Sequence, residues 1–201
     1  MRQFLILPLA LLASLHAQTV SQGGPPAPVR EPQPCQVTRI VDGDTIECAP
    51  FGRVRLIGMD TPEAGQQPFG EMATEALNQL LAVGSEVALE PDVDARDRYG
   101  RVLGYVWADG VMVNWALVRQ GYAVLLTYPP NVQYVDWLTA AQTAAREERL
   151  GLWAIDGFAC LPIEYRRGRC RWTLEYLHHL IESESVSRSY FNRAVCALRS
   201  F

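Results

Sequence analysis

Acidic and hydroxyl side chains that could bind a metal ion gather at two points of one short stretch of the chain. Asp44 follows an Asp-Gly turn, and Asp60, Thr61 and Glu63 come at the end of a later apolar run. Oxygen ligands of this kind suit calcium and do not suit zinc or copper. Arg55 lies within the same apolar run, and its planar guanidinium can grip phosphate oxygens. If the fold brings the two points together, these side chains can hold a cation beside a phosphate group.

Each of these features also has a purely structural interpretation. Asp-Gly is common in turns for conformational reasons, and Asp-Thr-Pro-Glu at residues 60–63 is typical of a helix start. Arg55 could be an edge-strand charge that blocks aggregation, and Arg101 could merely pair with Asp97. The functional interpretation depends on the ordered set, which includes Asp-Arg-Tyr-Gly-Arg at residues 97–101.

The residue types that are missing disfavour several kinds of active site. The chain contains no lysine, so it has neither a P-loop lysine nor a Schiff-base amine. Its three histidines are His16 and the adjacent pair His178 and His179, whose side chains would point in different directions on a helix. A Ser-His-Asp hydrolase and a zinc site of histidine and cysteine are therefore disfavoured. Carboxylates, arginine and tyrosine remain as the groups available for chemistry.

Short apolar runs and turn signals predict the strands that must position these side chains. Strands are expected at residues 37–41, 45–48, 53–58, 86–90 and 101–107, the first three joined by tight turns into an antiparallel meander. Helical spacing predicts helices at 70–83, 111–120 and 131–150, the last capped by Asn131. The pattern indicates an α+β protein, namely a five-stranded Greek-key barrel of the OB-fold type with three packed helices.

The chain divides into four segments. Residues 1–17 have the positive start and apolar core of a secretory signal peptide, and residues 18–34 form a Pro/Gly-rich leader expected to be disordered or extended. Residues 35–153 are expected to form the compact domain, and residues 154–201 a small helical extension that contains cysteines. We therefore expect a protein that is secreted to the medium or the periplasm and has no membrane anchor in its mature form. We also expect it to be a monomer. The formal net charge of −4 argues weakly against a nucleic-acid partner.

The five cysteines suggest disulfides, since export favours them. Cys35 and Cys48 flank the first hairpin and could be cross-strand neighbours. Cys160 and Cys170 bracket a short loop, and Cys196 could pair with either of them. Because five is odd, at least one thiol is free or intermolecular.

A basic run, Arg-Arg-Gly-Arg-Cys-Arg, occupies residues 166–171 of the extension, just before a helix predicted at 172–181. Such a run could add phosphate-binding surface, but charge runs are usually solvated faces. We interpret the extension as a small disulfide-stapled appendage that packs on the barrel.

Four motifs, taken in order, resemble the thermonuclease family of staphylococcal-nuclease-like secreted nucleases. They are V-D-G-D-T at 41–45, R-L-I-G-M-D-T-P-E at 55–63, D-R-Y-G-R at 97–101 and A-D-G-V-M-V-N-W-A-L-V-R-Q-G at 108–121. The resemblance covers about residues 36–153 and leaves out the leader and the extension. It implies the same barrel and a calcium-dependent phosphodiesterase that cuts DNA and RNA at the 5′ P–O bond, leaving 3′-phosphate ends.

The resemblance also implies roles for single residues near the metal and the scissile phosphate. Asp44 and Asp60 match metal-ligating carboxylates, and Thr61 matches a residue that offers its backbone carbonyl. Glu63 matches the acid that activates or orients the attacking water. Arg55 and Arg101 match the two arginines that bind the scissile phosphate.

Three further residues match substrate-binding positions. Arg98 and Tyr99 match residues that contact the phosphate end of the nucleotide, with Arg98 where the best-known member has lysine. Tyr128 is the nearest candidate for one further family tyrosine, in a loop that is a residue shorter here. The loop after Glu63 is also shorter than in the best-known member.

Two other functions fit the sequence less well. A non-catalytic oligonucleotide-binding module of the same fold would be favoured by loss of a site carboxylate or arginine, and none is missing. An extracellular interaction protein would use residues 154–201 as its working part, and deleting them would then abolish partner binding.

Overall fold

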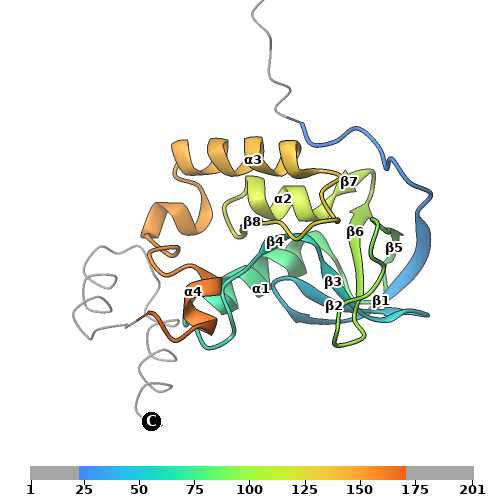
Figure 1. The fold of residues 1–201 in the computed structure, drawn as a ribbon, viewed down its shortest axis with the longest axis horizontal. Helices are drawn as coiled ribbons and strands as arrows, with labels where there is room; N and C mark the ends of the chain where they lie inside the picture. Colours follow the sequence, from blue (N-terminus) through green and yellow to red (C-terminus); the bar gives the residue numbers. More distant parts are fainter. Residues whose placement is uncertain (1–22, 171–201) are drawn as a thin grey trace, which may run out of the picture.

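The computed structural model describes residues 23–170 (Figure 1). The predicted signal peptide, the start of the leader, the helix predicted at 172–181, the histidine pair and Cys196 lie outside the described residues. Within the described range, no helix is long and apolar enough to cross a membrane.

Five strands close into a barrel, as the sequence predicts. They are β1 (Gln33–Asp42), β2 (Thr45–Ala49), β3 (Gly52–Leu56), β5 (Glu86–Glu90) and β6 (Val102–Ala108). Neighbours in the order β3-β2-β1-β5-β6 pair antiparallel, and a parallel pairing of β3 with β6 completes the circle. Closure removes the exposed edges that would otherwise pair with other chains. A short strand, β7 (Val111–Met112), turns back and pairs antiparallel with the end of β6.

The third predicted strand is divided in two. The barrel strand β3 ends at Leu56, and β4 (Gly58–Asp60) leaves the barrel to pair with β8 (Val124–Leu126). The division falls at Gly58, which has φ +78° and packs so closely on α3 that a Cβ would lie 2.5 Å from Leu138. The turn at this glycine carries Asp60 and the residues after it away from the barrel wall.

Three main helices lie on one side of the barrel, with α2 between α1 and α3 (Figure 1). They are α1 (Phe69–Leu80), α2 (Val113–Arg119) and α3 (Val135–Glu147). The second begins two residues later than predicted because residues 111–112 continue the sheet as β7. A 3₁₀ turn, η1 (Gly151–Ile155), and a short helix, α4 (Pro162–Arg166), follow.

The predicted cap of the third helix is wrong. Asn131 does not cap α3, which begins four residues later at Val135. Its buried side chain instead accepts a hydrogen bond from the Asp94 backbone nitrogen at 2.7 Å and donates one to the Asp94 carbonyl at 3.0 Å. Asn131 therefore fastens the loop between β5 and β6, because a buried amide needs partners for both of its polar ends.

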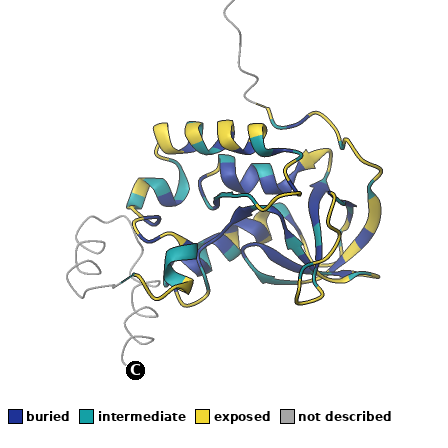
Figure 2. Ribbon diagram, in the orientation of Figure 1, coloured by how far each residue is buried: buried dark blue, intermediate teal, exposed yellow. Residues whose placement is uncertain are grey.

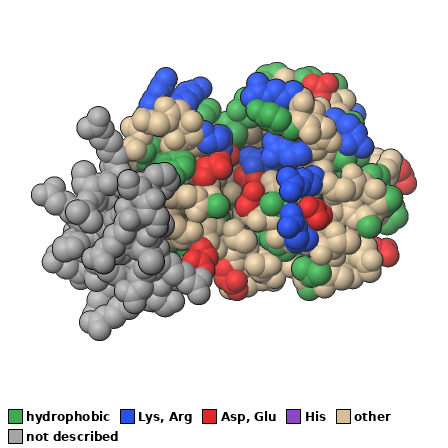
Figure 3. Space-filling view, turned by 90° about the horizontal axis from the view of Figure 1, so that it is seen from below, with side chains coloured by type: hydrophobic (Ala, Val, Ile, Leu, Met, Phe, Trp, Pro, Cys, Tyr) green, Lys and Arg blue, Asp and Glu red, His purple; other side chains and the backbone are tan. Residues whose placement is uncertain are grey.

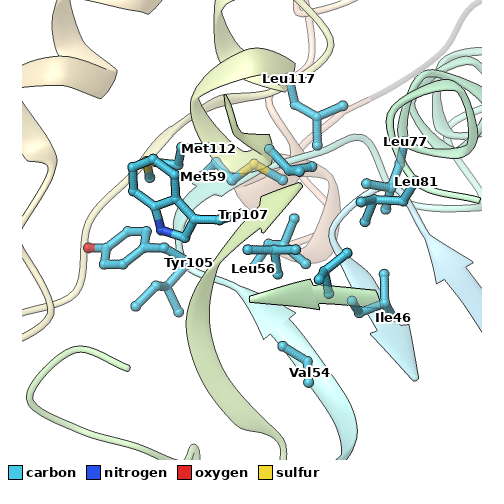
Figure 4. Packing of buried hydrophobic residues seen from close by; sticks show 14 of the residues in the cluster. Ile46, Val54, Leu56, Met59, Leu77, Leu81, Tyr105, Trp107, Met112 and Leu117 are labelled. Carbon is cyan, nitrogen blue, oxygen red and sulfur yellow. The ribbon is translucent and has the colours of Figure 1, made fainter. Parts of the chain in front are cut away.

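The main core fills the barrel and its contact with the helices. Ile46, Val54 and Leu56 from the barrel, Met59 from β4 and Leu77 from α1 are almost fully buried in one cluster (Figure 4). At the end of β3, buried Val54 and Leu56 flank the half-buried Arg55, whereas β6 is buried at four successive residues, Gly104 to Trp107 (Figure 2).

A second, smaller cluster joins the residues after α3 to the first helix. Leu152 and Phe158 pack with Phe69 of α1 and Val124 of β8. The backbone therefore remains packed against the body of the protein beyond the third helix.

Both disulfides follow the cysteine spacing. Cys35 joins Cys48 across β1 and β2, with Cα atoms 5.6 Å apart, and Cys160 joins Cys170 around α4, with Cα atoms 5.8 Å apart. The sequence left a pairing with Cys196 open, and the structure selects the loop closed by Cys160 and Cys170.

Candidate active site

The predicted site residues meet at one pocket of about 650 Å³. Eight of the nine line it: Asp44, Arg55, Thr61, Glu63, Arg98, Tyr99, Arg101 and Tyr128. The ninth, Asp60, is only 1% exposed. Figure 3 shows arginine side chains in a band beside acidic ones on one face of the molecule. The fold thus brings together residues from four separate segments of the sequence.

Arg55 joins the two aspartates that the sequence assigns to a metal. Its Nη1 forms an ion pair with Asp44 Oδ1, and its Nη2 donates to Asp60 Oδ1 at 2.8 Å. Burial lowers the pKa of the Arg55 guanidinium from its ordinary value, and the charge of Asp60 opposes that shift. One guanidinium therefore bonds both carboxylates.

The turn between β1 and β2 places Asp44 against the segment after β4. The Thr61 backbone nitrogen and Oγ1 both donate to Asp44 Oδ2, at 3.2 and 3.0 Å. A Cβ on Gly43 would lie 2.8 Å from Thr61 Oγ1 and 2.9 Å from the Cβ of Ala73. Gly43 therefore has a second role besides forming the turn: because it has no side chain, Asp44 can approach Thr61 closely.

Glu63 lies in a compact turn before α1. Its backbone nitrogen donates to Gln66 Oε1 at 2.9 Å, and its carbonyl accepts from the Gln66 nitrogen at 2.8 Å. Its carboxylate is partly exposed and accepts a hydrogen bond from Arg166 of α4 at 2.5 Å. The same arginine donates to Asp60 Oδ1 at 3.0 Å and Oδ2 at 2.8 Å.

Arg101 is oriented by Asp97, as one of the structural interpretations proposed. Arg101 Nε donates to Asp97 Oδ2 at 2.7 Å, while the backbone nitrogens of Arg101 and Tyr99 both donate to Asp97 Oδ1 at 2.9 Å. Burial alone would raise the Asp97 pKa, but the hydrogen bonds from Arg101 outweigh it and hold that pKa below its ordinary value. This pairing leaves Arg101 lining the pocket.

The remaining predicted residues form the exposed rim. Tyr99 is 70% exposed and Tyr128 is 64% exposed, although both are large aromatic side chains. Arg98 donates to the Tyr99 hydroxyl at 2.6 Å, and its guanidinium lies 4.8 Å from the centroid of that ring. An exposed aromatic ring with an arginine beside it offers a surface on which a nucleotide base can stack.

The oxygen donors in and directly behind the pocket wall have the chemistry that suits a hard divalent cation. Asp44 and Asp60 contribute buried carboxylates, and Thr61 follows directly in the chain with its backbone carbonyl. Among residues 23–170, no group of three or more His, Cys, Asp or Glu side chains forms a metal cluster. Two carboxylates supplemented by a carbonyl and water remain a normal oxygen environment for calcium.

Sequence reasoning missed the part played by Arg166. Its signal was weak because Arg166, Arg167 and Arg169 stand in one basic run. The flanking cysteines indicated a closed loop but not which arginine turns inward. Gln66 is fully buried between Glu63 and Cys160, and nothing in the sequence predicted that it would support the site.

The chain matches a known family and several named proteins. Residues 53–155 match the family model for staphylococcal nuclease homologues. The chain is 40% identical to the thermonuclease of Staphylococcus intermedius over 125 residues, which are 58% of this chain and 74% of the relative. It is 33% identical to the thermonuclease of Staphylococcus hyicus over 162 residues, 75% and 95% of the two chains. It is 35% identical to the endonuclease YncB of Bacillus subtilis over 155 residues, 71% and 73% of the two chains. Because the family model covers half of the chain and these relatives are at least 33% identical to it, the chain, with its closed five-stranded barrel, belongs to the staphylococcal nuclease family.

Proposed function

We propose that this protein is a secreted, calcium-dependent nuclease. It would hydrolyse phosphodiester bonds of DNA and RNA at the 5′ P–O bond and leave 3′-phosphate ends. The observation that carries the proposal is one pocket lined by Asp44, Glu63, Arg55 and Arg101, with the buried Asp60 bonded to Arg55 directly behind it. Relatives named thermonuclease and endonuclease support the reaction class, and the disulfides are consistent with export.

The pocket has the parts that phosphodiester hydrolysis requires. A phosphodiester is negatively charged, and more charge builds on its oxygens as water attacks, so the site must neutralise charge and aim the water. Asp44, Asp60 and the Thr61 carbonyl would hold the calcium ion. When bound, that ion supplies charge neutralisation and a site for water beside the phosphate.

The protein's own side chains supply the remaining functions. Arg55 and Arg101 approach the pocket from β3 and from the loop before β6, where each can fork onto phosphate oxygens. Glu63 faces the same space and can accept a proton from the attacking water or orient it. Arg98, Tyr99 and Tyr128 on the rim would bind the neighbouring nucleotide.

The direct test uses the purified mature chain with single-stranded DNA and RNA, with calcium or with excess chelator, followed by identification of the product ends. Calcium-dependent cutting that leaves 3′-phosphates is the expected result. Magnesium and manganese in parallel reactions distinguish calcium from other divalent cations. A folded protein that binds the oligonucleotide without cutting it would replace this proposal with the non-catalytic binding module.

A further inference from the structure

The segment after α3 is built into the wall of the pocket. Phe158 is buried in the second apolar cluster, and the Cys160 carbonyl accepts a hydrogen bond from Gln66 Nε2 at 3.0 Å. Tyr165 lies so close to Gly65 that a Cβ there would be 2.4 Å from its hydroxyl. The disulfide between Cys160 and Cys170 closes the loop around α4. These contacts attach the loop to the turn that carries Glu63.

Of the three described arginines in this loop, only Arg166 reaches the acidic side chains of the site. Its guanidinium contacts both oxygens of Asp60, and its Nη1 also contacts Glu63 Oε1. Arg167 and Arg169 instead pair with Glu164, at 3.1 and 3.2 Å, on the loop itself. The basic run therefore divides into one arginine that faces the pocket and two that do not.

The loop supports both the backbone and the carboxylate of Glu63. Gln66 holds its backbone nitrogen and also bonds Cys160. Throughout residues 23–170, Arg166 is the one side chain that hydrogen-bonds the Glu63 carboxylate. Asp60, by contrast, keeps Arg55 as a second partner. Without Arg166 the Glu63 carboxylate would rotate freely and would also be repelled by Asp60, because Nη1 bonds an oxygen of each.

We propose that Arg166 is a positioning residue for hydrolysis, which holds the Glu63 carboxylate beside Asp60 and is itself held by the Cys160–Cys170 loop. The inference rests on the proposed function of Glu63. Small displacements of a group that acts on the attacking water are costly in rate, and residues that orient such groups typically contribute about 10–100-fold. The loop thus provides a support for Glu63 from outside the family's motifs.

The first experiment compares Arg166→Gln with Arg167→Gln in the full mature chain. We expect Arg166→Gln to lower kcat about 10–100-fold with little change in KM, and Arg166→Lys to lose less because it keeps the charge without the fork. Arg167→Gln removes the same charge from the same loop and should leave kcat unchanged. Unchanged or increased kcat in Arg166→Gln would overturn the proposal.

A double-mutant cycle tests whether Arg166 acts through Glu63. In a Glu63→Gln background, Arg166→Gln should lower kcat no more than about twofold, because the group that it positions is already disabled. A full additional loss would overturn the proposal. Normal kcat in Glu63→Gln alone would instead contradict the proposed role of Glu63, so the two failures are distinguishable.

Calcium binding provides a readout that does not depend on activity. Titration calorimetry with calcium chloride should show that Arg166→Gln binds the ion at least as tightly as the parent, since a positive charge beside Asp60 is lost. Weaker binding would mean that Arg166 merely supports the fold, and would overturn the proposal.

A last variant tests the loop. Replacing Cys160 and Cys170 by serine should lower kcat as Arg166→Gln does. In the Arg166→Gln background, the same two serine substitutions should cause no further fall in kcat. A loop variant that keeps the parent kcat would show that the disulfide does not hold Arg166 in place.

Discussion

Arg55 shows how one side chain organises this site. It is largely withdrawn from water and contacts Asp44 and Asp60 together. Its desolvation is tolerable because both partners carry the opposite charge. Arg55 is therefore not an edge-strand charge: it links the barrel wall to the acidic pair and also lines the pocket.

The catalytic assignment predicts large rate losses from single substitutions. Arg55→Ala, Arg101→Ala and Glu63→Gln should each lower turnover at least about 100-fold, as electrostatic and acid–base groups typically do. Steady-state kinetics on folded variants checks this. Arg53→Ala is the matched control, because Arg53 is exposed on the same strand as Arg55 and pairs only weakly with Glu47. Near-normal turnover in any one variant would remove that residue from the mechanism.

Asp97 predicts a pH dependence of stability. Its pKa is lowered in the folded protein, so the stability it contributes is fully present above its ordinary pKa of 3.8 and is lost as pH falls through the lower folded value. Asp97→Asn should therefore reduce the free energy of unfolding by about 1 kcal/mol at pH 7. Urea unfolding should show this gap shrinking below about pH 4. A gap that stays constant down to pH 2 would contradict the assignment.

Among the elements, the turn between β1 and β2 matters most for the metal. Gly43→Ala would place a Cβ 2.8 Å from Thr61 Oγ1, so the turn must shift and move Asp44 from Thr61. We expect calcium affinity to fall about tenfold or more, since supporting contacts of a metal site commonly contribute that much. Calorimetric titration measures it.

Gly84→Ala is the control for that turn. Gly84 has φ +94°, so alanine is strained there too, but no atom lies within 4 Å of the added Cβ and Gly84 is outside the pocket. Its variant should lose stability and keep calcium affinity. Equal calcium affinity in both variants would show that Gly43 only shapes the turn.

At the scale of the whole molecule, Glu90 ties four parts of the chain together. Its buried carboxylate accepts hydrogen bonds from the backbone nitrogens of Val29 and Arg30, from Trp107 on β6 and from Tyr134 beside α3. The proline-rich leader is therefore fastened to the barrel at residues 29–30, before β1 begins.

Removing this carboxylate should destabilise the whole domain. Glu90→Leu leaves several buried donors without a partner, at about 1–3 kcal/mol each, so we expect the free energy of unfolding to fall by at least about 3 kcal/mol. Glu86→Leu, exposed on the same strand, should change it by less than about 1 kcal/mol. Equal effects in urea unfolding would show that the network is not structurally important.

The sequence alone determined the barrel and most of the pocket. Alternating apolar residues and the Asp-Gly turn fix the pairing of β1, β2 and β3 locally, so the places of Asp44 and Arg55 follow from strand register. The sequence also marks Asp60, Thr61 and Glu63 as site residues, but their place depends on the turn at Gly58. The division of the third strand at Gly58 and the partner of Asn131 did not follow, because packing against α3 and the loop after β5 decides them.

Only the tertiary structure decided that Arg166 enters the site. It lies 106 residues from Asp60 in the chain, and nothing in its local sequence separates it from Arg167 or Arg169. Its direction is set by the disulfide around α4 and by the buried bond from Gln66 to Cys160. A contact between distant segments depends on how whole elements dock, which side-chain periodicity and turn chemistry do not encode.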